Sequence, residues 1–173
     1  PEVLYSFGRV GSVEVSPDKS KILYQVSYVS IEENKINPEL FVMNADGSDK
    51  KRLTFTNARE SNPQWIKGGS RIAFLSNEKG SSQIWSIKPD GSGMRKINNI
   101  DGGISGFLFS PDEKKVLFIK NVKYGENVQD LYPDLPEASG RIRDDLMYKH
   151  WDHWVEEVPH VFVADVTENK LSN

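Results

Sequence analysis

The fold is decided by a stretch in the middle of the chain, Trp65-Ile-Lys-Gly-Gly-Ser-Arg-Ile-Ala-Phe74, and by its continuation Ile84-Trp-Ser-Ile-Lys-Pro-Asp-Gly91. Short apolar runs alternate here with turns rich in Gly, Ser, Pro and Asp, a pattern typical of β-strands joined as hairpins. Gly91 follows Asp90 at the point where a tight hairpin needs a residue with positive φ. The stretch predicts four short strands, at about 61–66, 70–76, 82–88 and 94–98.

Both halves of this stretch recur along the chain. The copies lie at 15–24, 109–118, 40–47 and 161–167. Leu40 and Ile84 are 44 residues apart, and Ile66 and Ser110 are also 44 residues apart. Four short strands in a period of about 40–45 residues are typical of a β-propeller blade. We therefore expect an all-β fold, a partial β-propeller of about three four-stranded blades.

The third copy of the repeat is longer than the others. Ile84 and Val161 are 77 residues apart, 33 more than the period. We expect one incomplete propeller domain over 1–173, with an insertion at about 121–158 between the second and third strands of the third blade. The predicted blades lie at about 9–55, 61–100 and 104–173.

Three blades are fewer than the four to eight of a closed propeller. We therefore expect a fragment of a larger propeller rather than a complete small domain, and the start at Pro1 without Met also suggests a processed or cut chain. Exposed blade edges are expected to favour self-association.

Composition excludes several classes of protein. The 173 residues include 22 Lys and Arg against 25 Asp and Glu, a net charge of −3, so no basic surface for nucleic acid is predicted. The chain has no cysteine, which excludes disulfides and thiolate zinc sites. It has no apolar run long enough to span a membrane.

The insertion contains the one stretch with helical periodicity. Met147, Trp151, Trp154 and Val158 follow one another at steps of four, three and four, which predicts an amphipathic helix within 141–158. Tyr132-Pro-Asp-Leu-Pro136 upstream predicts an extended or turn segment, because residues before proline avoid the α region. The tryptophans are expected either to dock the helix on the propeller or its partner domain, or to contribute to substrate binding.

His150 and His153 stand three residues apart, where both imidazoles can approach one ion, but a zinc site needs further ligands. His160, the remaining histidine, lies past Pro159 in the next expected strand. No metal site and no cofactor are predicted.

The turns carry a family resemblance. Ser16-Pro-Asp18, Ser110-Pro-Asp112, Met43-Asn-Ala-Asp-Gly47 and Ile87-Lys-Pro-Asp-Gly91 resemble the repeats of TolB-like propellers, which also form the N-terminal propeller of the prolyl oligopeptidase family of serine peptidases. Three further segments resemble the dipeptidyl-peptidase V and acylaminoacyl peptidase group of that family. They are 1–10, 141–154 and 159–165.

This resemblance implies that the propeller caps an α/β-hydrolase domain with a Ser-Asp-His triad, and that it restricts access to short peptides. The family's nucleophile elbow, Gly-x-Ser-x-Gly, is absent, and Ser105 in Gly103-Ile-Ser-Gly-Phe107 is expected to be a turn residue. No catalytic residue is therefore predicted in this segment. Catalysis is expected in a C-terminal hydrolase domain missing from the chain, so the parent is expected to be an enzyme and this segment alone is not.

The resemblance also suggests a substrate-binding site at the end of the insertion, formed by Glu156, Glu157, Trp154 and His153. Relatives use adjacent glutamates on a propeller-borne helix to bind the free α-ammonium of a peptide, which is positively charged at neutral pH. The alternative for Glu156 and Glu157 is a solvated helix end. An acylaminoacyl substrate has no such ammonium.

Two functions remain at this point. The leading hypothesis is the propeller of a serine exopeptidase that gates and helps to bind short peptides, in the periplasm or alternatively in the cytoplasm. Its partners are the peptide substrate and the hydrolase domain. The alternative is a non-enzymatic TolB-like propeller that binds proteins. The insertion favours the first, since a plain adaptor does not require it.

Overall fold

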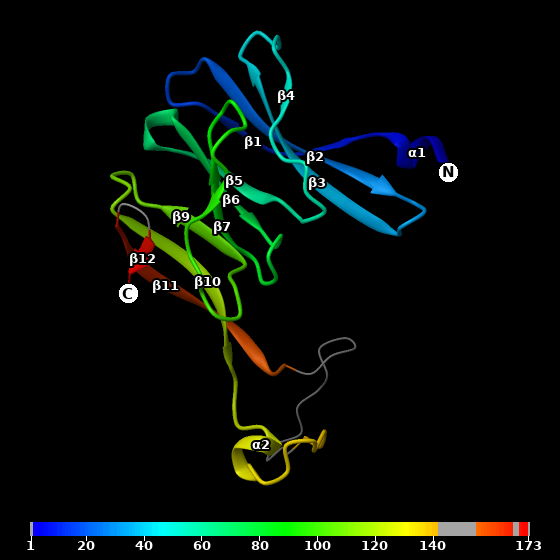
Figure 1. Cartoon of the computed structure of the whole chain (residues 1–173), viewed down its shortest axis with the longest axis vertical. Coiled ribbons are helices and arrows are strands. Elements are labelled where there is room, and N and C mark those ends of the chain that lie inside the picture. The colour runs from blue at the N-terminus through cyan, green and yellow to red at the C-terminus, as the bar shows by residue number, and fades with distance from the viewer. Residues whose placement is uncertain (1, 142–154, 168–169, 173) are drawn as a thin grey trace. The chain divides into compact units, whose positions relative to one another are not determined.

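The computed structural model describes residues 2–141, 155–167 and 170–172. Three four-stranded sheets dominate this part of the chain (Figure 1), so the predicted all-β fold with about three four-stranded blades is confirmed. The chain divides into two compact units, residues 1–120 with 161–173 and residues 121–160. None of the helices in the described part of the chain is long and apolar enough to cross a membrane.

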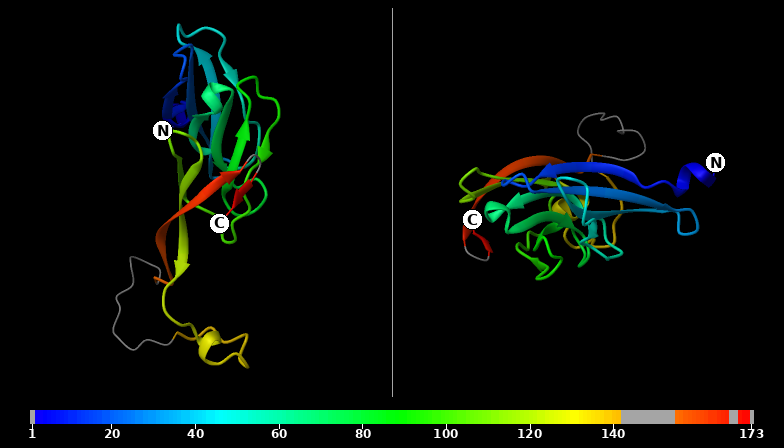
Figure 2. Two further views of the ribbon diagram at one scale, coloured as in Figure 1. Left: turned by 90° about the vertical axis from the view of Figure 1, so that its left-hand side faces the viewer. Right: turned by 90° about the horizontal axis from the view of Figure 1, so that it is seen from above.

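Each sheet is built from strands that are consecutive in the chain (Figures 1 and 2). After a short helix α1 (Glu2–Ser6), the first sheet contains β1 (Arg9–Val15), β2 (Lys21–Ser30), β3 (Lys35–Asn44) and β4 (Lys51–Arg52). The second contains β5 (Ser61–Ile66), β6 (Arg71–Ser76), β7 (Gln83–Ile87) and β8 (Arg95–Lys96), with the 3₁₀ turn η1 (Lys67–Gly69) after β5. The third contains β9 (Gly106–Phe109), β10 (Lys115–Lys123), β11 (Glu157–Thr167) and β12 (Lys170–Ser172).

The hairpin turns repeat with the period seen in the sequence. Gly47 and Gly91, 44 residues apart, have φ of 84° and 82°, the positive values expected for them. In both turns the preceding aspartate accepts a hydrogen bond from a serine N–H, at 2.9 Å for Asp46 and 2.8 Å for Asp90. The same local chemistry therefore closes the same hairpin in consecutive blades.

The second sheet is buried on both faces because its neighbours cover it. Successive side chains of a strand point to opposite faces, and along β6 the side chains of Ile72 and Phe74 alternate with those of Ala73 and Leu75. The first seam, between the first and second sheets, contains Leu23, Leu40, Val42, Leu53, Ile72, Phe74, Trp85 and Ile87. The second seam, between the second and third sheets, contains Ile66, Ala73, Leu75, Ile84, Ile104, Phe107, Val116, Phe118 and Ala164.

The faces of the first and third sheets that point away from the seams carry exposed apolar side chains. Val13 and Val15 pair with Tyr24 and Ile22, on the face opposite to that of Leu23. Their exposed fractions are 57% and 55%, and on the third sheet the exposed apolar side chains include Leu108, Val161 and Val163. The described residues thus leave one apolar face uncovered at each end of the row of sheets.

The second unit corrects the helix prediction. Met147, Trp151 and Trp154 lie outside the described residues, whereas Val155 and Glu156 are not helical and Val158 belongs to β11. The predicted helix to residue 158 is therefore wrong at this end. Pro159 supplies the physical reason, because it disfavours the α region for the residue before it.

The described insertion instead contains a single-turn helix, α2 (Val128–Leu131), that the sequence did not suggest. The Asn127 side chain accepts a hydrogen bond from the Asp130 N–H at 2.9 Å, and the Asp130 carboxylate accepts one from the Asn127 N–H at 2.7 Å. This reciprocal capping fixes the start of α2. Downstream, the Leu135 N–H donates to the Tyr132 carbonyl at 3.0 Å, so the predicted turn segment is confirmed.

Candidate functional site

A polar hollow of about 330 Å³ lies within the second unit and includes one of the predicted substrate-binding residues. Both ends of the insertion contribute to it, together with α2. It is lined by Lys123, Tyr124, Gly125, Glu126, Asn127, Gln129, Ala138, Ser139, Gly140, Arg141 and Glu156.

Glu156 is held in the hollow by its backbone and by its side chain. Its carbonyl accepts a hydrogen bond from the Tyr124 N–H at 2.8 Å, which extends the pairing of the two ends of the insertion beyond β11. Its carboxylate accepts a hydrogen bond from Nε of Arg141 at 2.7 Å. With 58% of the Glu156 side chain exposed, water screens this ion pair and leaves the carboxylate accessible to a ligand.

Glu157 is the first residue of β11, and it is exposed and does not line the hollow. Neighbouring residues of an extended strand point to opposite faces. The two adjacent acids are therefore not presented together as at a helix end. The described geometry brings Glu156, and not Glu157, to the hollow.

The other two predicted binding residues, Trp154 and His153, lie outside the described residues, as does His150. Their role stays a prediction. Within the described ranges, no cluster of three or more His, Asp or Glu side chains has the arrangement that could hold a metal ion.

The remaining side chains of the hollow are mostly polar. Nζ of Lys123 forms an ion pair with the Asp130 carboxylate, and Nε2 of Gln129 donates to the Ala138 carbonyl at 2.5 Å. Hydrogen bonding by Lys123 lowers the pKa of Asp130. A carboxylate and a guanidinium side by side can accept hydrogen bonds from an ammonium group and donate them to a peptide carbonyl.

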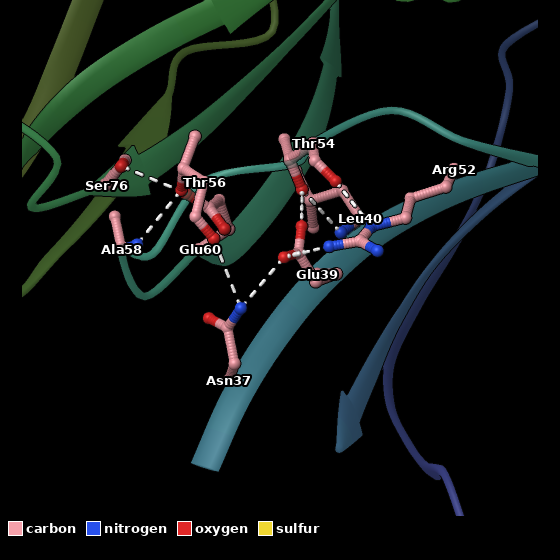
Figure 3. A network of polar contacts seen from close by, with 9 residues as sticks. All are labelled: Asn37, Glu39, Leu40, Arg52, Thr54, Thr56, Ala58, Glu60 and Ser76. Atoms are coloured by element: carbon pink, nitrogen blue, oxygen red, sulfur yellow. Dashed lines mark hydrogen bonds and ion pairs between the residues drawn. The ribbon is translucent and has the colours of Figure 1, made fainter. Parts of the chain in front are cut away.

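A second polar cluster lies at the first seam and was missed by sequence reasoning (Figure 3). Glu39 on β3 is 1% exposed, and both of its carboxylate oxygens are engaged. Nη2 of Arg52 donates to Oε1 at 2.5 Å, and Oγ1 of Thr54 donates to Oε2 at 2.6 Å. Nδ2 of Asn37 donates to Oε1 at 2.9 Å.

Glu60, in the same cluster, is the last residue of the segment that joins β4 to β5 and is 0% exposed. Its Oε1 accepts hydrogen bonds from Oγ1 of Thr56 at 2.6 Å and from Oγ of Ser76 at 3.1 Å. Its Oε2 is buried and has no hydrogen-bond partner among the described residues. Charged residues are rarely this buried.

The repeat itself contained a signal for this cluster. Gln83 stands 44 residues after Glu39, and its side chain also binds the segment that follows the last strand of its sheet. Nε2 of Gln83 donates to the Ile100 carbonyl at 2.7 Å, and Oε1 accepts from the Ile100 N–H at 2.9 Å. Thr54 and Asn98 are likewise 44 residues apart, and each accepts a hydrogen bond from a third-strand N–H. Polar residues at equal positions of the repeat thus mark the seams.

The chain is similar to known proteins over nearly its whole length. A model of the family described as TolB beta propeller domain matches residues 3–137. The chain is 49% identical to a dipeptidyl-peptidase 5 of Porphyromonas gingivalis, over 99% of this chain and 25% of that protein. It is 42% identical to a dipeptidyl-peptidase 5 of Porphyromonas endodontalis, with the same coverage.

Among solved structures, the chain resembles an acylaminoacyl peptidase of Pyrococcus horikoshii, with a TM-score of 0.71 and 15% identity. The match covers 99% of this chain and 25% of that protein. This likeness concerns the fold. The chain spans about a quarter of the length of the curated relatives it matches.

Proposed function

Because the chain belongs to the TolB beta propeller domain family and is homologous to dipeptidyl peptidases, we propose that it is the propeller segment of a serine exopeptidase. In this proposal the segment gates and helps to bind short peptides. Catalysis resides in an α/β-hydrolase domain outside these 173 residues.

One observation carries the proposal, the 49% identity to a dipeptidyl-peptidase 5 over 99% of this chain. The aligned region includes the insertion, which a protein-binding propeller would not need. The uncovered apolar faces of the first and third sheets support a larger propeller, because each suits a further blade. In the absence of such blades, the same faces are expected to associate between copies of the chain.

The insertion is the proposed substrate-binding element, and Glu156 is its proposed contact for the N-terminal ammonium of the peptide. The polar hollow and the exposed carboxylate beside Arg141 support this assignment. Glu157, Trp154 and His153 remain proposed contributors. The proposed compartment is the periplasm, which fractionation of source cells with an antibody to this segment tests.

Replacing Glu156 by Gln in the full-length enzyme is expected to raise KM for dipeptide substrates with a free amine by about fivefold to tenfold. The variant removes one charge-assisted hydrogen bond, and solvent exposure reduces the effect below that of a buried bond. KM for an N-acylated ester cleaved at the same site is expected to stay unchanged. The measurement is steady-state kinetics on both substrates.

Glu126→Gln is the matched control, since Glu126 is an exposed glutamate that lines the same hollow. It is expected to leave both KM values near wild type. Equal losses on the free and blocked substrates in Glu156→Gln would contradict ammonium binding by this residue. A full-length parent without hydrolase activity would instead favour the protein-binding propeller.

A further inference from the structure

Glu60 is a buried acid that the proposed peptidase function does not use. It lies at the end of the segment 53–60, which connects the first sheet to the second. We propose that Glu60 is a neutral carboxylic acid in the folded chain, and that its ionisation loosens the first seam, which makes the joint between the first two blades sensitive to pH. This inference is independent of the catalytic role of any parent protein.

The two carboxyl oxygens of Glu60 have different surroundings. Two hydroxyl groups, from Thr56 and Ser76, donate to Oε1 of Glu60, as they would to the carbonyl oxygen of a neutral acid. Oγ1 of Thr56 in turn accepts from the Ala58 N–H at 3.1 Å, so its own hydrogen is free to point at Oε1. Oε2 is buried and has no donor among the described residues, so a full negative charge on the carboxylate would be only partly compensated by hydrogen bonds.

The charged groups around Glu60 disfavour its ionisation. Glu39 from β3 and Glu78 from the loop after β6 both contribute negative charge. The guanidinium of Arg52 on β4 is bound to Glu39, and Arg59 is exposed. None of the described hydrogen bonds or ion pairs brings a cation to Glu60.

Burial raises the pKa of Glu60 to about 7, and the charges of Glu39 and Glu78 add to this rise, against the hydrogen bonds from Thr56 and Ser76. The ordinary glutamate value is 4.5. The folded chain holds the Glu60 proton more tightly than the unfolded chain does. The resulting stabilisation of the fold is therefore complete below pH 4.5, the ordinary pKa of glutamate. It is lost as the pH rises through about 7.

Glu60 contacts strands of both sheets that form the first seam, so a change in its charge affects the seam directly. The Glu60 carbonyl accepts a hydrogen bond from Nε2 of Gln25 on β2 at 2.5 Å, and its N–H donates to the carbonyl of Pro38 on β3 at 3.4 Å. Its side chain contacts Ser76 on β6 of the second sheet. Glu60 therefore connects the first and second sheets. An unpaired charge on its buried carboxylate is costly, and separating the two sheets lowers this cost by admitting water.

The test compares the 173-residue chain with its Glu60→Gln variant, in which an amide replaces the neutral acid. Between about pH 5.5 and about pH 8.5, the contribution of Glu60 to the folding equilibrium of wild type is expected to fall by about 30-fold. Glu60→Gln is expected to lack this component, and Glu126→Gln is expected to retain it. Urea unfolding at each pH gives the equilibrium constants.

Two further measurements keep the proposal falsifiable if Glu60→Gln does not fold. The ¹³C resonance of the Glu60 carboxyl in wild type is expected to titrate with a midpoint near 7, and the amides of Leu40 and Leu53 are expected to exchange faster once Glu60 is ionised. A midpoint near 4.5, the ordinary value, would overturn the proposal. Parallel pH profiles of wild type and Glu60→Gln would also overturn it.

Discussion

Replacing Phe74 by Ala is expected to lower the free energy of unfolding by about 3–5 kcal/mol, the range for deleting a buried phenyl ring from a packed core. Phe74 is 0% exposed and lies in the first seam, between the apolar side chains of two sheets. Removing the ring loses the free energy of burying its apolar surface, and it leaves a cavity that the surrounding strands cannot close without shifting. Denaturant unfolding followed by circular dichroism measures the change.

Phe55→Ala is the matched control for this variant. Phe55 is 73% exposed, and its ring contacts the Arg52 guanidinium at 4.7 Å from the ring centroid. An exposed cation–π contact contributes about 0.5–1 kcal/mol, so only a small change is expected. Similar losses in the two variants would mean that the seam is not the packed interface described here.

Replacing Gly103 by Ala is expected to destabilise the chain by about 3 kcal/mol or more, because two separate costs add. Gly103 has φ of 80°, a conformation that costs an L-residue about 1–2 kcal/mol. An added Cβ would also lie 2.8 Å from the Ser82 carbonyl oxygen. That oxygen accepts the Ile104 N–H at 2.9 Å and cannot move away without breaking the joint between the second and third sheets.

Gly102→Ala separates the two costs. Gly102 has φ of 76°, but the nearest atom to an added Cβ is the flexible Cε of Lys120 at 3.9 Å. Only the conformational cost of about 1–2 kcal/mol is expected for this neighbour. Thermal unfolding of both variants is the measurement, and equal melting temperatures would contradict the close approach of Gly103 to Ser82.

Much of the blade architecture could be predicted because it depends on local chemistry that recurs. The second sheet was expected at about 61–66, 70–76, 82–88 and 94–98, and its strands lie at Ser61–Ile66, Arg71–Ser76, Gln83–Ile87 and Arg95–Lys96. Turns such as that of Gly91 depend on a few neighbouring residues, so the sequence reveals them directly.

The helix prediction is wrong at residue 158 because the backbone restriction imposed by Pro159 outweighs the helical spacing of the apolar side chains. Trp154 and Val158 are four residues apart, a spacing that suits a helix, but Val158 precedes Pro159 and belongs to β11. The pairing partner of Glu156, the Tyr124 backbone, is distant in the sequence. Such long-range pairing leaves no periodic signal.

The buried acids could not be predicted as such, since their burial depends on two sheets meeting. Glu39 looks like a solvated residue before an apolar strand until β4 and the following segment cover it. Glu60 looks like a loop residue until Ser76 of the next sheet contacts it. The sequence offered one signal for these residues: a polar residue, Gln83, stands one repeat period after Glu39 and has a similar role in its own sheet.

The central proposal is that this chain is the propeller segment of a larger serine exopeptidase, and the size and reactivity of the native protein test it most directly. An antibody to this segment would be used on lysate of the source cells after labelling with an active-site serine probe. Since the chain spans 25% of its curated relatives, we expect a labelled band of about four times 19.6 kDa. An unlabelled band, or one near 20 kDa, would contradict the account.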